Sequence, residues 1–76
     1  MRKTVDVKFV ARFGKNLRRI RKSKKVSMEK LAYDSGMDYS QVSRVEKGQI
    51  NTSISTVKVF ADSLGVDVHI LFQFED

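Results

Sequence analysis

The chain has 76 residues, no cysteine and no proline, so it is expected to form one small domain without disulfide or thiolate–metal support. No apolar segment approaches the roughly 20 residues of a membrane span, and the charged N-terminus lacks the unbroken apolar stretch of a secretory signal, which favours a cytoplasmic protein. The formal net charge is +6, but residues 1–25 carry eleven Lys and Arg against one acid, and the remainder carries four against eight. A pI near 9.9 indicates a polyanionic partner, nucleic acid first and an acidic membrane surface second, although a solvated charged face explains the charge equally well.

The first periodic segment, residues 7–24, is predicted to be an amphipathic helix that follows a basic N-terminal arm, residues 1–6. Its apolar stripe recurs at helical spacing and consists of Phe9, Val10, Phe13, Leu17 and Ile20. A basic row lies roughly opposite and consists of Lys8, Arg12, Lys15, Arg19 and Lys22. Arg21 lies at the margin of the apolar stripe. Gly14 costs this helix about 1 kcal/mol relative to alanine, so close packing of another element at that position is expected.

A second helix is predicted over residues 28–35, because Ser27 is a suitable N-cap and Gly36 can adopt the left-handed conformation that ends a helix. Its inward face is expected to be formed by Met28, Leu31, Ala32 and Ser35.

A third, short helix is predicted over residues 39–47, between its cap Asp38 and Gly48. Its closeness to the preceding helix is typical of a helix-turn-helix, in which two helices meet at a steep angle across a turn of three or four residues. Val42 and Val45 hold this third helix against the core. Its remaining surface consists mostly of hydrogen-bonding and cationic side chains, namely Tyr39, Ser40, Gln41, Ser43, Arg44 and Lys47.

The last part of the chain predicts two more helices and a short tail. A fourth helix begins after Ser53 and ends at Gly65, and its expected apolar stripe consists of Ile54, Val57, Phe60, Ala61 and Leu64. Asp67 caps a last short helix over residues 68–72, and residues 73–76 form a frayed or extended tail. Residues 7–10 and 66–74 could also be strands, but helix is preferred for both. The prediction is therefore an all-α, five-helix single domain over residues 1–76.

From about Phe13 to Phe72 the chain resembles the λ-repressor-like domain of the Cro/CI type, the XRE family. The ordered motifs that carry the resemblance are Leu-Arg-x-Ile-Arg, Ser-x-Glu-x-Leu-Ala, Ser-Arg-Val-Glu-Lys-Gly and Leu-Gly-Val. No single motif is diagnostic, but the ordered set of motifs is a strong resemblance. The resemblance implies a compact five-helix domain that binds double-stranded operator DNA, usually as a dimer. The chain is therefore expected to be a cytoplasmic, nucleoid-associated transcription regulator that acts as a repressor or autoregulator.

In such a domain, helix 39–47 would be the recognition helix and lie in the major groove of a palindromic operator. The expected base contacts are Tyr39, Ser40, Gln41, Ser43 and Arg44. Arg44 is the preferred reader, because a guanidinium pairs bidentately with guanine, and Gln41 could pair with adenine in the same manner or reach a phosphate.

Phosphate contacts are expected from helix N-termini and from the loop after the third helix. The candidates are Ser27, Met28, Lys47, Gln49, Asn51 and Thr52. Met28 departs from the family, in which a glutamine is common at this position. The basic residues expected to compensate are Lys24 and Lys25, or Arg2 and Lys3 of the arm.

Two further features concern the scaffold and its assembly. Arg21 and Glu46 match a family pair in which an arginine of the first helix bridges to the glutamate that ends the third, so both residues are interpreted as structural. The C-terminal segment carries more apolar residues than one face of a short helix can bury, which predicts a homodimer interface at Val68, His69, Leu71, Phe72 and Phe74. The alternative, that this segment folds back onto its own core, is equally favoured.

Other classes of protein are less well supported. An enzyme is not expected, because His69 is the only histidine and no carboxylate or serine is recognisably placed beside it. The scattered acids predict no metal site, and no motif predicts a cofactor. The main alternative is an antitoxin-like or other protein-interaction module whose partner is a toxin or another regulator. A membrane-surface role for the first helix is disfavoured, because its apolar stripe is needed to close the core.

Overall fold

A computed structural model describes residues 5–74 of the chain. The described elements are, in order, α1 (Val7–Ser23), α2 (Met28–Ser35), α3 (Tyr39–Glu46), α4 (Ile54–Leu64) and the 3-10 helix η1 (Val68–Phe72). Within this part of the chain there is no strand, so the all-α prediction holds. Most of the predicted basic arm, including Arg2 and Lys3, and the last two residues of the predicted tail lie outside the described residues.

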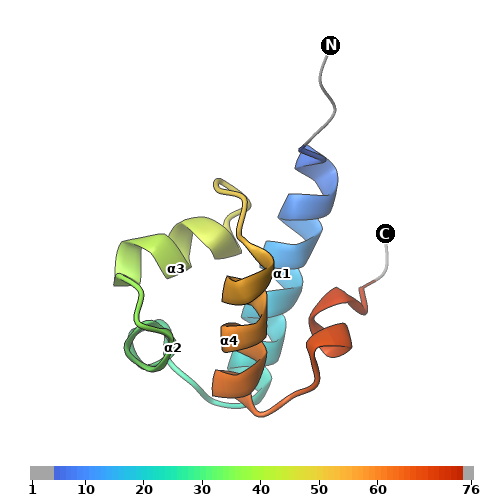
Figure 1. Cartoon of the computed structure of the whole chain (residues 1–76). Coiled ribbons are helices and arrows are strands. Elements are labelled where there is room, and N and C mark those ends of the chain that lie inside the picture. Colours follow the sequence, from blue (N-terminus) through green and yellow to red (C-terminus); the bar gives the residue numbers. More distant parts are fainter. Residues whose placement is uncertain (1–4, 75–76) are drawn as a thin grey trace.

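α1 and α4 lie along the middle of the molecule, with α2 and α3 on one side and η1 on the other (Figure 1). The fifth element is the one that differs from the prediction, because it is a 3-10 helix of five residues rather than an α-helix. Its bonds run from Ile70 N to the Asp67 carbonyl and from Gln73 N to the Ile70 carbonyl, at 3.0 and 3.2 Å. Short helices often adopt this tighter turn, in which the bonds run from residue i to residue i+3. None of the described helices is long and apolar enough to cross a membrane.

Side-chain caps confirm the predicted helix starts at Ser27 and Ser53, whereas Asp67 precedes η1 without a side-chain cap bond and Asp6 is a cap that was not predicted. The hydroxyl of Ser27 accepts a hydrogen bond from Lys30 N at 3.0 Å, and that of Ser53 accepts one from Thr56 N at 3.1 Å. The carboxylate of Asp6 caps α1 by accepting a bond from Phe9 N at 3.0 Å. These caps satisfy amide groups that have no partner inside the first turn of a helix.

All four α-helices end in the same pair of backbone hydrogen bonds around a left-handed residue. In α2, α3 and α4 that residue is a glycine, whereas in α1 it is Lys25, with φ of +60°. Lys25 N donates to the Lys22 carbonyl at 3.0 Å, and Val26 N donates to the Arg21 carbonyl at 3.1 Å. This is the Schellman arrangement, in which glycine is preferred because a Cβ is strained in the left-handed region.

Lys25→Gly is therefore expected to raise the free energy of unfolding by about 0.5–1 kcal/mol, because relief of the left-handed strain exceeds the extra entropy of glycine in the unfolded chain. The matched control is Lys24→Gly, which removes the same charge at a residue with ordinary helical dihedrals, φ of −88°. That control is expected to lower the stability. Urea denaturation followed by circular dichroism measures both changes, and equal effects of the two substitutions would contradict the prediction.

The core is formed by one face of each element, as the apolar spacing predicts. Its buried members are Phe13, Leu17, Ile20, Leu31, Ala32, Val42, Val45, Val57, Phe60, Ala61, Leu64 and Leu71. Three residues of the predicted stripes lie outside this core: Phe9 is 43% exposed, Ile54 is 90% exposed, and Val10 is only half-buried. Ile54 is the first residue of α4 and lies at the margin of its apolar stripe, so its side chain projects past the surface that α4 buries.

The C-terminal segment folds back onto the core of its own protomer. Leu71 is fully buried, with 0% exposure, so it cannot belong to a dimer interface, and its assignment there is corrected. Phe72 stacks on Phe9 with ring centroids 5.9 Å apart, and it lies 5.1 Å from the ring of Phe13. Phe74 is half-buried and its ring lies 5.5 Å from that of Phe9. These contacts cover the N-terminal half of the α1 stripe.

Candidate nucleic-acid interface

α2 and α3 are joined by a tight turn that begins at Gly36. This glycine has φ of +71°, and the amide of the following Met37 donates to the Ala32 carbonyl at 3.0 Å, which closes the end of α2. α3 then packs on the core through Val42 and Val45, both buried. The two helices meet across this short turn, as the sequence predicts.

The outward face of α3 carries the side chains that were predicted to contact base edges. Tyr39, Ser40, Gln41 and Arg44 are exposed, and Ser43 is half-buried. Val42 and Val45 turn the inner face of α3 toward the core, so the five predicted base-contact residues cover the rest of its surface. Ser40, Ser43 and Arg44 are neighbours at helical spacing on this surface, with Tyr39 and Gln41 at its two margins.

Gln41 has a local role that the sequence reading missed. Its side-chain oxygen accepts a hydrogen bond from the backbone N–H of Asp38 at 2.9 Å, the reciprocal bond of a capping box. Bidentate pairing with adenine needs that oxygen as an acceptor, so Gln41 would have to give up this cap to read adenine in the predicted way. The spacing of Asp38 and Gln41, three residues apart at a helix start, is the signal that identifies the cap.

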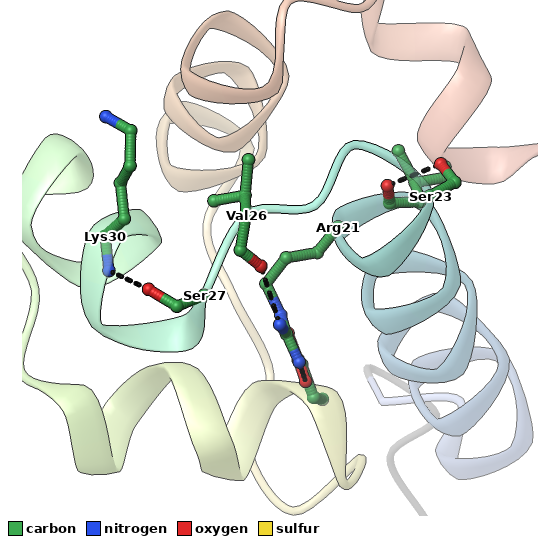
Figure 2. Close-up of polar contacts among 7 residues, drawn as sticks. Arg21, Ser23, Val26, Ser27 and Lys30 are labelled. Atoms are coloured by element: carbon green, nitrogen blue, oxygen red, sulfur yellow. Dashed lines mark hydrogen bonds and ion pairs between the residues drawn. The ribbon is translucent and has the colours of Figure 1, made fainter.

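The C-terminal end of α3 is held to α1 by the predicted pair of Arg21 and Glu46. Arg21 Nε donates to Glu46 Oε2 at 2.6 Å, and Nη2 donates to Oε1 at 3.1 Å, with side-chain exposures of only 8% and 4%. Nη1 donates to the Val26 carbonyl at 2.8 Å. Figure 2 shows the Arg21 side chain reaching from α1 past Val26 toward α3. One guanidinium thus connects α1, the turn into α2 and the end of α3.

Backbone contact supports the same junction. A Cβ added at Gly14 would collide with the carbonyl oxygen of Val45 and lie 2.8 Å from that of Glu46. A Cβ at Gly48, the residue that ends α3, would lie 2.8 Å from the Cα of Ala11. The close packing expected at Gly14 is present, and it places the end of α3 directly on α1.

The predicted phosphate-contact residues form two groups at the edges of this face. Ser27 is exposed at the N-terminus of α2 beside the Arg21 junction, where its hydroxyl caps the helix (Figure 2). Met28 packs its side chain against the core, so only its backbone amide can serve an anion there. The second group lies at the end of α3 and in the following loop, where Lys47, Gln49 and Asn51 are exposed and Thr52 is half-buried.

A buried polar residue, Asn16, was missed by the sequence reading. Its Nδ2 donates to the carbonyls of Ile70 and Leu71 at 3.1 and 2.9 Å, which ties η1 to α1. Its Oδ1 accepts two bonds from Arg19, at 3.1 Å from Nε and 2.7 Å from Nη2. The signal was available, because Asn16 is three residues after Phe13 and four before Ile20, in line with the apolar stripe.

Little else in the described residues offers a chemical site. No group of three or more His, Asp or Glu side chains is placed to hold a metal ion in the part of the chain that the structure describes. Asp34 on α2 accepts a bond from Lys30 at 3.0 Å, which lowers the pKa of its carboxyl group, and it also accepts a bond from Ser63 on α4 at 3.2 Å. The bond from Ser63 joins α2 to α4 at the surface.

Two helices that meet at a glycine turn, the second with an exposed polar and cationic face, define a helix-turn-helix DNA-binding domain. The model of the helix-turn-helix family matches residues 17–71, so the chain belongs to this family, and it is a DNA-binding transcription regulator.

Individual relatives are regulators as well. The control protein C.BamHI of Bacillus amyloliquefaciens is 35% identical over 63 residues, which are 82% of this chain and 78% of that protein. The restriction-modification controller protein C.AhdI from Aeromonas hydrophila is 40% identical, with a TM-score of 0.81 over 83% of this chain and 96% of that one. The clp gene regulator ClgR from C. glutamicum is 25% identical, with a TM-score of 0.80 over 83% of this chain and 82% of that one.

Proposed function

We propose that the chain is a controller of restriction–modification genes that binds a palindromic DNA operator as a homodimer and acts as a repressor or autoregulator. The observation that carries this proposal is the rigid mounting of the exposed α3 face by the buried pair of Arg21 and Glu46. The likeness to C.BamHI and C.AhdI supports the choice of controller among transcription regulators.

In the proposed complex α3 lies in the major groove. Two N–H groups of the Arg44 guanidinium donate to O6 and N7 of a guanine, and Tyr39, Ser40 and Ser43 contact neighbouring bases or phosphates. The N-terminus of α2, at Ser27, and the loop after α3 contact the phosphates on the two sides of the groove. Backbone contacts position the domain, whereas the α3 side chains read the sequence.

The proposed dimer uses the surface around η1. Phe72 is 39% exposed, Val68 and Phe74 are half-buried and His69 is exposed, so apolar surface remains after Leu71 has entered the core. Ile54 and Phe9 add exposed apolar side chains beside Phe72, around a shared hollow. A two-fold dimer would place its recognition helices about 34 Å apart, one turn of the DNA.

The test is selection from a pool of randomised duplex DNA, followed by sequencing, at two salt concentrations. The proposal predicts recovery of a palindrome with half-sites about one helical turn apart, and an affinity that falls steeply with salt. Retention of DNA that depends on salt but enriches no sequence would refute a sequence-specific regulator and leave only a general affinity for polyanions.

Arg44→Ala is expected to relax the preference at one base pair of each half-site by about 1–3 kcal/mol, with the fold intact. The guanidinium is exposed on α3, so its loss leaves the core unchanged. Competition binding with operators mutated one base pair at a time measures the effect.

The matched control for Arg44 is Lys47→Ala on the same surface. Lys47 is expected to contact phosphate only, so its loss weakens all sequences alike and lowers the salt dependence. An unchanged base preference in Arg44→Ala would show that another residue reads the sequence.

A further inference from the structure

A row of basic side chains on α1 lies outside the helix-turn-helix but borders it. Lys15, Arg18 and Lys22 are separated by three and four residues, so they follow one line along the helix, and all three are exposed. Ala11 continues the same line by another turn. The adjacent line of α1 contains Gly14 and Arg21, the two residues that contact the end of α3.

Contacts at both ends show where this row runs. At one end, Ala11, one turn before Lys15, lies against Gly48, which follows exposed Lys47 in the chain. At the other end, the carbonyl of Lys22 accepts a bond from Lys25 N in the turn that leads to α2. The row therefore connects the two groups of predicted phosphate contacts. From Lys15 to Lys22 it spans about 10 Å, the rise of about three nucleotides along a DNA strand.

The positive charge of α1 is not balanced by acids of the same helix. Its sequence, VKFVARFGKNLRRIRKS, contains no acid, and Lys15, Arg18 and Lys22 are like charges at spacings that destabilise an isolated helix. Arg21 differs, because Glu46 neutralises it. Arg19 differs too, because Asn16 holds it toward the η1 side. The row beside α3 is thus an exposed cationic surface, of the kind that polyanions bind.

We propose that Lys15, Arg18 and Lys22 form a phosphate-contact row that binds the DNA backbone alongside the major groove occupied by α3. This inference rests on the proposed function, since it takes its orientation from α3. The row contributes affinity without sequence information, because phosphates are the same at every base pair. It also gives this domain a phosphate contact beyond the helix N-termini and the α3–α4 loop.

The test measures the association constant against salt concentration for the full chain, on the selected operator and on a random duplex of equal length. Arg18→Gln is expected to lower the slope of log K against log salt by about 0.9 on both duplexes, the value for one phosphate contact. Lys15→Gln/Arg18→Gln/Lys22→Gln is expected to lower it by about 2.7, with the same preferred sequence. The matched control is Lys58→Gln, which removes one positive charge from the exposed side of α4 and is expected to leave the slope unchanged.

The outcomes separate this inference from the function on which it rests. If Arg18→Gln and the triple variant change the slope no more than Lys58→Gln, the row is not a phosphate contact, even though the wild-type chain selects an operator. If they change the preferred sequence instead of the slope, the row reads bases and the inference is wrong. If the wild-type chain selects no sequence, the proposed function fails, while the slopes on the random duplex still decide the role of the row.

Thermal unfolding checks the fold of each variant, and the triple variant is expected to be at least as stable as wild type, because it removes repulsion between like charges.

Discussion

Gly14→Ala is expected to lower the free energy of unfolding by about 3 kcal/mol and to weaken DNA binding of the molecules that remain folded. The added methyl group would collide with the Val45 carbonyl and lie 2.8 Å from the carbonyl oxygen of Glu46, and both groups belong to backbone that cannot move without displacing α3. A domain of 76 residues has a total stability of roughly 4–11 kcal/mol, so this loss is a large share of it. Urea denaturation and operator binding measure the two effects.

The sign of this effect is diagnostic. In the middle of a helix, replacing glycine by alanine normally stabilises a protein by about 1 kcal/mol, because glycine is the poorer helix former. Lys15→Ala, at the exposed neighbour of Gly14, serves as the control for the unfolding measurement alone and is expected to change the stability little. A Gly14→Ala variant as stable as wild type would show that α1 and α3 do not approach as closely as described.

Glu46→Ala is expected to lower the free energy of unfolding by about 3–5 kcal/mol, because it leaves the buried guanidinium of Arg21 without its counter-charge. Removing the anion costs more than the intact pair contributes, since the cation stays desolvated. Chemical denaturation measures this loss. The same variant is expected to bind the operator poorly even where it is folded, because the end of α3 is no longer held to α1.

A double-mutant cycle separates the pair from its surroundings. Arg21→Met/Glu46→Leu replaces both charges by apolar side chains of similar size and is expected to be more stable than Glu46→Ala. The gain in stability from replacing the ion pair by apolar side chains is expected to be incomplete, because the Val26 carbonyl loses the bond that Arg21 Nη1 donates. Strict additivity of the Arg21→Met and Glu46→Leu effects, within about 0.5 kcal/mol, would contradict a direct interaction.

The bounds of the α-helices could be predicted from the sequence, whereas the helix type of the C-terminal segment could not. Helix starts and ends follow from local chemistry, so Ser27, Ser53 and Gly36 mark boundaries that the structure reproduces. η1 carries an equally clear cap residue, Asp67, but a segment of five residues cannot show from its sequence whether it forms α or 3-10 turns. Which of the two turns η1 forms depends on the surface against which it packs.

Residues at the margins of a stripe show the same limit. Ile54 and Leu71 are both large aliphatic residues near the end of an element, yet one is 90% exposed and the other is fully buried. Leu71 is buried because Asn16 on α1 binds the backbone of η1 and holds it against the core. Neither the exposure of Ile54 nor the burial of Leu71 follows from the apolar periodicity. Periodicity shows which face of a helix is apolar, but it does not show which element packs against that face.

The sequence by itself determined the all-α class, the bounds of the four α-helices and the helix-turn-helix, because caps, glycine ends and apolar spacing act within a few residues of one another. The family resemblance added the pair of Arg21 and Glu46. Only the tertiary structure decided that α1 meets the end of α3 through the backbone at Gly14 and Gly48, and that the row from Lys15 to Lys22 borders the recognition helix. These features depend on how elements distant in the sequence pack. A backbone contact at glycine that leaves no room for a Cβ, or a charged surface shared by two helices, exists only when the two helices have been brought together.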